Sequence, residues 1–266
     1  MKSSKIIATL TAVCSIAPLM LSAKTPNPPS VESGTHVPAG FTFSLGGEYS
    51  RVHQVTSDGV PNYDGNLGGV LAKFEYERKN HLYAVASALW NEGRLKSHKG
   101  PRADVTEGVW EGGLGYTLSW GSERKWMLTP FAGFGYRKFV NELGRTPQTS
   151  AITISYQSYY IPVGIKLEYS SHMTWRYGFT GKIMPSVDQR LYVYSVTGTY
   201  WKEVRKCAYS AEFPITYSLL AFGSSRFELS LVPFVKYWQM GSASVAGLPN
   251  VKQIYWGSDL VLGLTY

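Results

Sequence analysis

Residues 110–120, WEGGLGYTLSW, decide the fold. Trp, Gly, Leu and Tyr occupy the even-numbered positions, while Glu, Gly, Thr and Ser occupy the odd-numbered ones. An alternation of period two places one set of side chains on each face of a β-strand. The stretch is also longer than the roughly five or six residues that are usual for strands of soluble domains. It therefore predicts a long strand with one apolar and one polar face.

The same alternation recurs along the chain, and ten segments carry such an apolar row. They are residues 41–49, 70–76, 82–90, 110–120, 126–136, 159–169, 175–183, 209–219, 227–237 and 254–266. Short connections at 77–81, 121–125, 170–172 and 222–226 alternate with long ones at 54–62, 91–104, 141–151, 186–204 and 241–253. Sorted turn lengths are typical of up-and-down barrels, in which all turns of one kind lie at one end. We therefore expect an all-β fold, an antiparallel barrel of about ten strands.

Aromatic residues bracket the apolar rows, and charged residues occupy the opposite face in mid-strand. Trp and Tyr prefer the membrane–water interface, and strands of this length suit a tilted wall that crosses a bilayer. Hydrocarbon offers no partner to an unpaired strand edge, so such a sheet must close. We expect the apolar rows to face lipid and the charged side chains to form a network in the lumen. The expected lumen residues are Glu48, Lys73, Glu75, Glu111, Lys166, Glu168, Arg176, Lys182, Glu212, Glu228, Lys236 and Asp259.

These charges allow two interpretations, a narrow path for ions or solutes and a plug of salt bridges. Barrels of about eight strands are just wide enough to be filled by side chains, whereas open aqueous channels appear at about 16 strands. The strand number therefore favours the plug.

The N-terminus has the layout of a cleaved secretory signal over residues 1–23. Lys2 and Lys5 precede an apolar run at 6–21, and small residues follow at 22–23. Residues 24–39 are rich in Pro, Ser and Asn and predict a flexible periplasmic lead-in to a barrel over 40–266. Cys14 lies in the signal, so the mature chain keeps only Cys207 and forms no internal disulfide.

Composition supports a membrane protein that crosses as strands. Aromatic residues make up 14% and charged residues 17% of the chain, which excludes a disordered tail, a coiled coil and a collagen-like repeat. The mean hydropathy of −0.13 excludes a bundle of several membrane helices. The net charge is +8, yet no run of Lys and Arg exceeds two residues. We therefore expect anionic lipid head groups rather than nucleic acid as the partner of this charge.

At this point the chain resembles bacterial outer-membrane β-barrel proteins. The signal, the alternating rows, the sorted connections and the C-terminal strand SDLVLGLTY (258–266) carry the resemblance. It implies a transmembrane antiparallel up-and-down β-barrel in the outer membrane, with periplasmic termini and contacts to outer-membrane lipid and lipopolysaccharide. It also implies an assembly signal that the barrel-assembly machinery reads, formed here by Leu260, Leu262, Leu264 and Tyr266.

Ten strands is also the size of the omptin proteases and of the Opc-type adhesins. The omptin resemblance would imply two acidic pairs and an Asp-x-His at the extracellular rim, but the sequence has no Asp-x-Asp and no His two positions after an Asp. Outer-membrane lipid A acylases and deacylases place a His and a Ser with an acidic partner near the rim. His53, Ser57 and Asp58 form the nearest such cluster, which we interpret as solvated loop residues. We therefore expect no catalytic site, no cofactor and no metal.

Two of the long connections carry candidate contact residues. In 91–104, Arg94, Lys96, Lys99 and Arg102 either form a solvated loop or contact phosphates of lipopolysaccharide or sulfated host glycans. The connection 186–204 is too apolar for a solvated loop that only joins two strands. This favours a hairpin that projects past the membrane. The hairpin would then serve as a contact surface for a ligand. The candidate contact residues are Tyr192, Tyr194, Tyr200 and Trp201.

Three functions stay open at this stage. The first is a non-enzymatic surface protein whose loops contact lipopolysaccharide or a host or matrix ligand. The second is a narrow channel for ions or small solutes. The third is a lipid- or peptide-modifying enzyme of the outer membrane.

Overall fold

Thirteen β-strands form one sheet in the computed structural model. The structure describes residues 40–56, 62–78, 80–97, 102–121, 125–144, 152–171, 174–194, 200–202, 206–222, 225–240 and 250–266. The strands are β1 (Gly40–Thr56), β2 (Tyr63–Glu77), β3 (His81–Ser97), β4 (Ala103–Trp120), β5 (Trp126–Leu143), β6 (Ile152–Tyr160), β7 (Val163–Ser170), β8 (Trp175–Val193), β9 (Tyr200–Lys202), β10 (Cys207–Glu212), β11 (Ile215–Phe222), β12 (Ser225–Met240) and β13 (Val251–Thr265). The expected signal peptide (1–23) and lead-in (24–39) lie outside the described residues. The described residues contain no helix that is long and apolar enough to cross a membrane.

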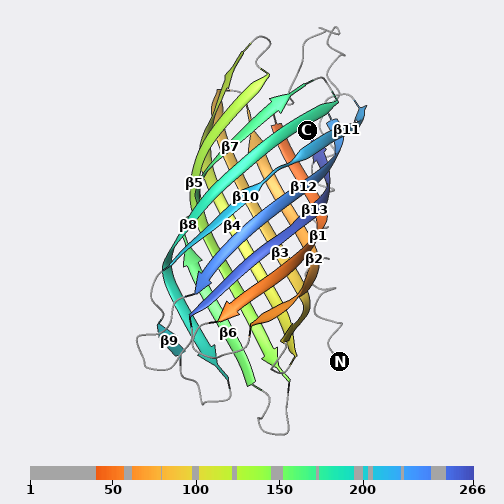
Figure 1. Cartoon of the computed structure of the whole chain (residues 1–266). Helices are drawn as coiled ribbons and strands as arrows, with labels where there is room; N and C mark the ends of the chain where they lie inside the picture. The colour runs from red at the N-terminus through yellow and green to blue at the C-terminus, as the bar shows by residue number, and fades with distance from the viewer. Residues whose placement is uncertain are drawn as a thin grey trace, which may run out of the picture. The chain divides into compact units, whose positions relative to one another are not determined.

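The sheet closes on itself because its first and last strands pair. β1 runs antiparallel to both β2 and β13, and β13 also pairs with β12. At the seam, Phe41 and Tyr266 exchange two backbone hydrogen bonds of 3.1 and 2.8 Å. Figure 1 shows the strands winding obliquely around the barrel wall. The predicted closed antiparallel barrel is confirmed.

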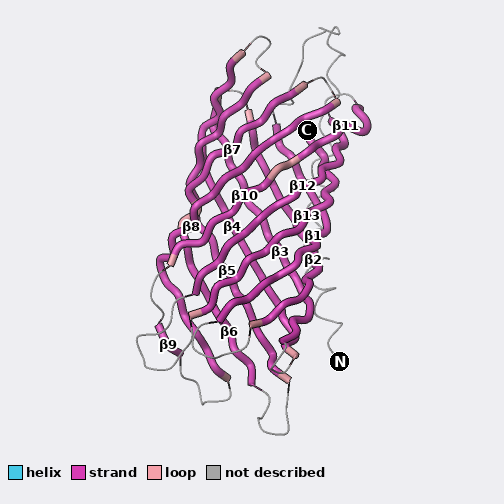
Figure 2. The backbone as a smooth tube through the Cα atoms, in the orientation of Figure 1, coloured by secondary structure: helices cyan, strands magenta, loops and turns pink. Residues whose placement is uncertain are grey.

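The thirteen strands build a wall of ten, and two proline residues account for two of the three extra strands. β5 pairs with Tyr160 of β6 and with Val163 of β7 in one continuous register, so β6 and β7 are one barrel strand. Pro162 has no N–H to donate, but its carbonyl accepts a hydrogen bond of 2.9 Å from the Gly133 N–H. Pro214 likewise divides one barrel strand into β10 and β11, and its carbonyl accepts a hydrogen bond from the Gly178 N–H. Figure 2 shows the short loop between these two strands.

The third extra strand, β9, belongs to a hairpin at the long-loop end. β8 pairs with β9 at Arg190 opposite Lys202 and with β10 at Pro185 opposite Cys207, which is the same register. β9 therefore extends β10 along β8 toward the long-loop end. The flanking strands pair as a hairpin, as predicted, and much of the expected long connection 186–204 is strand.

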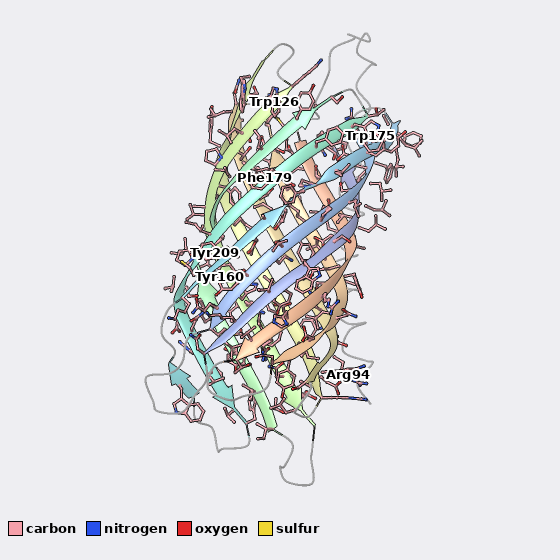
Figure 3. The ribbon with its side chains drawn as sticks, viewed as in Figure 1. Arg94, Trp126, Tyr160, Trp175, Phe179 and Tyr209 are labelled. Carbon is pink, nitrogen blue, oxygen red and sulfur yellow. The ribbon has the colours of Figure 1, made fainter. Side chains whose placement is uncertain are left out.

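The outer surface of the barrel carries the apolar rows. Leu114, Leu231 and Leu262 are 62%, 45% and 58% exposed, so the predicted outward orientation is confirmed. Aromatic side chains form two girdles around this apolar band. The short-turn girdle comprises Trp120, Trp126, Tyr169, Trp175, Tyr177, Tyr217 and Tyr266. The long-loop girdle comprises Trp90, Trp110, Tyr136, Tyr159, Tyr209, Tyr237 and Trp256. In Figure 3, Trp126 and Trp175 lie at the opposite end of the barrel from Arg94.

The distance between the girdles matches a bilayer. The pairs Trp110 and Trp120, Trp126 and Tyr136, Tyr159 and Tyr169, and Trp256 and Tyr266 are each ten residues apart. At about 3.3 Å per residue and a strand tilt of about 40°, ten residues rise about 25 Å. That rise is the height of the apolar band of transmembrane barrels.

Beyond the long-loop girdle the alternation of the strands inverts. Apolar side chains now point inward and are buried, for example Val52 at 0% and Leu95 at 1% exposure, while charged side chains point outward. The outward set is Arg51, Glu92, Arg94, Lys96, Asp104, Lys138, Glu142, Arg190 and Lys252. We call the wall between the girdles the membrane half and the wall beyond the long-loop girdle the projecting half.

The inversion corrects the expected strand ends. β3 continues to Ser97 and β4 begins at Ala103, so most of the expected connection 91–104 is strand. β5 and β8 likewise extend to Leu143 and Val193. The strand ends predicted from the sequence come too early because they were placed where the outer apolar row stops. In the projecting half the apolar row lies on the inner face instead.

Candidate functional site

The barrel interior is the first candidate site, and all twelve expected lumen residues lie on the inner face. Glu48, Lys166, Glu168, Glu228 and Asp259 are less than 10% exposed. The others alternate with outward residues on the same strands. The structure divides these side chains between two clusters along the lumen, and a third cluster is built from residues outside the predicted set.

The cluster nearest the short turns is centred on Lys166. Its Nζ lies 2.7 Å from both Glu75 Oε1 and Glu77 Oε2 and 3.3 Å from Glu168 Oε1, while Lys73 Nζ lies 2.7 Å from Glu75 Oε2. Glu77 is a member that sequence reasoning missed, although its position two residues after Glu75 puts it on the inner face. Arg176 and Glu228 pair at 2.7 Å.

The middle cluster is built from Lys182 and Lys236. Lys182 Nζ lies 2.9 Å from Glu111 Oε2 and 3.3 Å from Glu212 Oε1, and Lys236 Nζ lies 2.8 Å from Glu48 Oε2. Asp259 lies directly opposite Glu48 in the ladder. Among the described residues, no cation pairs with it within 4.0 Å.

Arg137 forms the third cluster, at the boundary between the two halves. The side chain is 2% exposed. Its Nε donates to Glu107 Oε1 at 2.6 Å, and one terminal nitrogen donates to Gln253 Oε1 and the Tyr255 hydroxyl at 2.7 and 2.6 Å. The guanidinium carbon also lies 4.4 Å from the centre of the Trp238 ring. The satisfied donors and the aromatic face compensate the desolvation of this charge.

The period of two in the sequence could have predicted that Arg137 and Glu107 both point inward. Arg137 follows Tyr136, the last outward aromatic of the row 126–136, so the period of two predicts that it points inward. Glu107 lies two positions before Val109 and four before Glu111, on the same inner face.

An apolar core occupies the lumen around and beyond Arg137. It brings together side chains from nearly every strand, and Phe139 and Tyr160 at 0% exposure are its most buried aromatics. The members are Val52, Tyr63, Leu67, Leu95, Ala103, Val105, Phe139, Tyr156, Tyr160, Met184, Leu191, Ala208, Phe234, Trp238, Met240, Val251 and Tyr255. Below this core lies a cavity of about 150 Å³ that Glu48, Lys182, Lys236, Trp238 and Tyr255 help to line. The cavity reaches the Arg137 partners Glu107, Trp238 and Tyr255, and most of the core lies on its long-loop side.

The basic residues of the expected connection 91–104 have different surroundings. Arg94 and Lys96 point outward from β3, not from a loop, which corrects their expected placement. Arg94 Nε lies 2.6 Å from Asp104 Oδ1, and both side chains are more than half exposed. Arg102 is exposed just before β4, and Lys99 lies outside the described residues.

The four aromatic residues of the projecting hairpin do not form one surface. Tyr192 and Tyr194 point outward, and Tyr194 is 58% exposed. Trp201 instead packs against the inner apolar core, so its expected place on the contact surface is corrected. The backbone of Tyr200 pairs with that of Tyr192, and its side chain lies outside what the structure describes.

The remaining candidates are a histidine on the outer wall and the C-terminal strand. His53 Nδ1 lies 2.7 Å from Asp64 Oδ1 on the neighbouring strand, while Ser57 and Asp58 lie outside the described residues. In the described part of the chain, no three His, Cys, Asp or Glu side chains gather in a way that could hold a metal ion. The residues of the expected assembly signal, Leu260, Leu262, Leu264 and Tyr266, all point outward.

Comparison with known proteins adds the fold and little else. No protein-family model and no curated protein matches the sequence. The outer membrane protease OmpT from Escherichia coli is similar in structure, with a TM-score of 0.53 and 10% identity over 89% of this chain and 100% of that chain. The outer membrane protein OprG from Pseudomonas aeruginosa gives 0.42 at 13% identity, covering 88% and 99%, and the translocator domain of the autotransporter NalP from Neisseria meningitidis gives 0.46 at 8% identity, covering 86% and 88%. The likeness to OmpT shows that this chain has the fold of an outer-membrane β-barrel.

Proposed function

We propose that the protein is a non-enzymatic surface protein of the bacterial outer membrane, and that its projecting half contacts ligands outside the hydrocarbon. The girdle spacing and the exposed apolar band support a position in the bilayer. The inverted wall beyond the long-loop girdle supports a part that stands in water, with charged side chains directed outward.

The cage around Arg137 is the observation that carries the proposal. A channel needs a continuous aqueous path, and here a buried cation with three polar partners and an indole against its face lies in the lumen. The apolar core above it adds a second barrier to ions. Since we propose that the lumen is closed at this level, the outer surface of the projecting half is the part that can meet a ligand.

A narrow channel is the second candidate, because the cavity of about 150 Å³ beneath Arg137 has charged walls. Planar-bilayer recordings test both candidates. We expect the wild-type barrel to be silent and the double variant Arg137→Ala/Trp238→Ala to show at most brief openings, because it removes the cation and its ring but leaves the apolar core as the second barrier. Steady wild-type conductance would overturn the surface-protein proposal and favour the channel. The heat-modifiable gel mobility of folded barrels checks that each protein has refolded.

A further inference from the structure

An aromatic surface lies on the outer wall over β5, β6 and β8. It extends from the long-loop girdle into the projecting half. Its members are Tyr136, Tyr159, Tyr192 and Tyr194, which we call the tyrosine platform. The Tyr136 and Tyr159 rings are 4.8 Å apart, and the Tyr192 and Tyr194 rings are 6.4 Å apart and nearly parallel, at 18°. All four side chains lie on the outer face, and the row of Lys138, Gln157 and Arg190 runs between the two pairs of rings.

The surroundings of the platform are polar and fixed. Arg190 is hydrogen-bonded to the Tyr192 hydroxyl and paired with Asp188 at 2.6 Å, which anchors one edge. Ser155 lies opposite Tyr192 in the ladder and is completely buried on the outer face. Its Oγ has no hydrogen-bond partner among the described residues. Because this oxygen is completely buried, the tyrosine rings and hydroxyl groups are the parts of the platform that a ligand can reach.

The depth of the platform identifies what it faces. Tyr159 is a member of the long-loop girdle and lies opposite Asp188, and Tyr194 is six positions further along β8. Six residues of a strand tilted by about 40° rise about 15 Å. The platform thus extends from the membrane interface through the layer of lipid head groups, and it faces sideways into that layer rather than upward.

We propose that the tyrosine platform binds the core saccharide of an outer-leaflet glycolipid, a lipopolysaccharide, through stacking of sugar rings on Tyr192 and Tyr194. The C–H faces of a pyranose pack against an aromatic ring, and its hydroxyl groups bond to the Tyr hydroxyls. The phosphates of lipid A lie lower, near the girdle, and contribute less to this site. The inference rests on the proposed position of the barrel in the outer membrane.

Binding of two glycolipids to the refolded barrel in detergent tests the inference. One is rough lipopolysaccharide with a complete core, and the other is lipid A without the core. We expect the wild type to prefer the first by about tenfold in Kd, and Tyr192→Ala/Tyr194→Ala to abolish that preference while leaving lipid A binding unchanged. Tyr192→Phe/Tyr194→Phe keeps both rings and should retain most of the preference.

Tyr209→Ala/Tyr237→Ala is the matched control, because this outward pair belongs to the same girdle but lies on β10 and β12, outside the platform. It should leave the preference intact. Equal wild-type affinity for the two glycolipids, or an unchanged preference after the double alanine substitution, would overturn the inference. Free core oligosaccharide that binds as tightly as the intact glycolipid would also overturn it, because the site would then serve a soluble glycan. Failure of the proposed function appears instead as wild-type conductance, so the two failures are distinguishable.

Discussion

The membrane half and the projecting half of this barrel use the same strands with opposite patterns. In the membrane half, leucines such as Leu114 face outward and charged side chains such as Lys182 face inward. In the projecting half, Leu95 faces inward and its neighbour Arg94 faces outward. The backbone ladder is continuous through both halves, as the unbroken pairing of β2 with β3 shows.

The solvent outside the wall explains the difference. Lipid accepts apolar side chains and leaves the lumen as the place for ionised groups, which then pair with one another. Water accepts the charged side chains of the projecting half, so its apolar residues gather inside, as in a soluble protein. The point at which the alternation inverts thus marks the level at which a strand leaves the bilayer.

The largest expected effect concerns the boundary between the halves. Arg137→Met leaves Glu107, itself 3% exposed, without its cation. The uncompensated buried carboxylate should lower the free energy of unfolding by about 3–5 kcal/mol. Arg137→Met/Glu107→Gln should recover most of that loss, because no buried charge remains. Urea unfolding of the barrel in phosphocholine vesicles, followed by Trp fluorescence, measures both. Equal stability of the two variants would show that the lumen is wet at this level.

Packing inside the projecting half should matter almost as much. Leu95→Ala opens a cavity in a closed core and should cost about 2–5 kcal/mol. Leu231→Ala faces lipid, whose chains fill the space and are as apolar as the lost side chain, so we expect a loss below about 1 kcal/mol. The same unfolding measurement compares them. Similar losses at the two positions would break the contrast between a dry core and a lipid-facing band.

The sequence predicted the membrane half well because one rule governs it. A fixed period of two, aromatic residues at both ends of a row and sorted connections each point to the same barrel, so strand number and orientation follow. Rows such as Trp126 to Tyr136 needed no knowledge of the lumen.

The projecting half was predicted poorly because its pattern is the reverse. Val52, Leu95 and Phe139 continue the alternation on the other face, and their charged neighbours look like loop residues when only an outer apolar row is sought. The cage of Arg137 was missed for a second reason. Its partners come from β4, β12 and β13, and no local spacing shows that Glu107, Trp238 and Tyr255 meet at one level of a closed barrel.

A charge introduced on the outer face should sharpen the comparison further. Leu114→Arg places a guanidinium in the middle of the apolar band and should cost about 2–4 kcal/mol. Thr106→Arg lies on the outer face of the same strand in the projecting half, where surface substitutions change stability by less than about 0.5 kcal/mol. Equal effects in vesicles would show that the bilayer does not end at the long-loop girdle.

The smallest expected effect is at the pair of Arg94 and Asp104. Their 2.6 Å contact is short, but the side chains are 58% and 61% exposed, so water and salt screen it. Arg94→Ala should therefore change the free energy of unfolding by less than about 1 kcal/mol, and the difference should shrink further between low and high salt. Arg137 and Arg94 both pair with a carboxylate at 2.6 Å, so only their surroundings separate the large expected effect from the small one. A loss at Arg94 as large as that at Arg137 would mean that the outer wall is not solvated there, and that a bound group covers it.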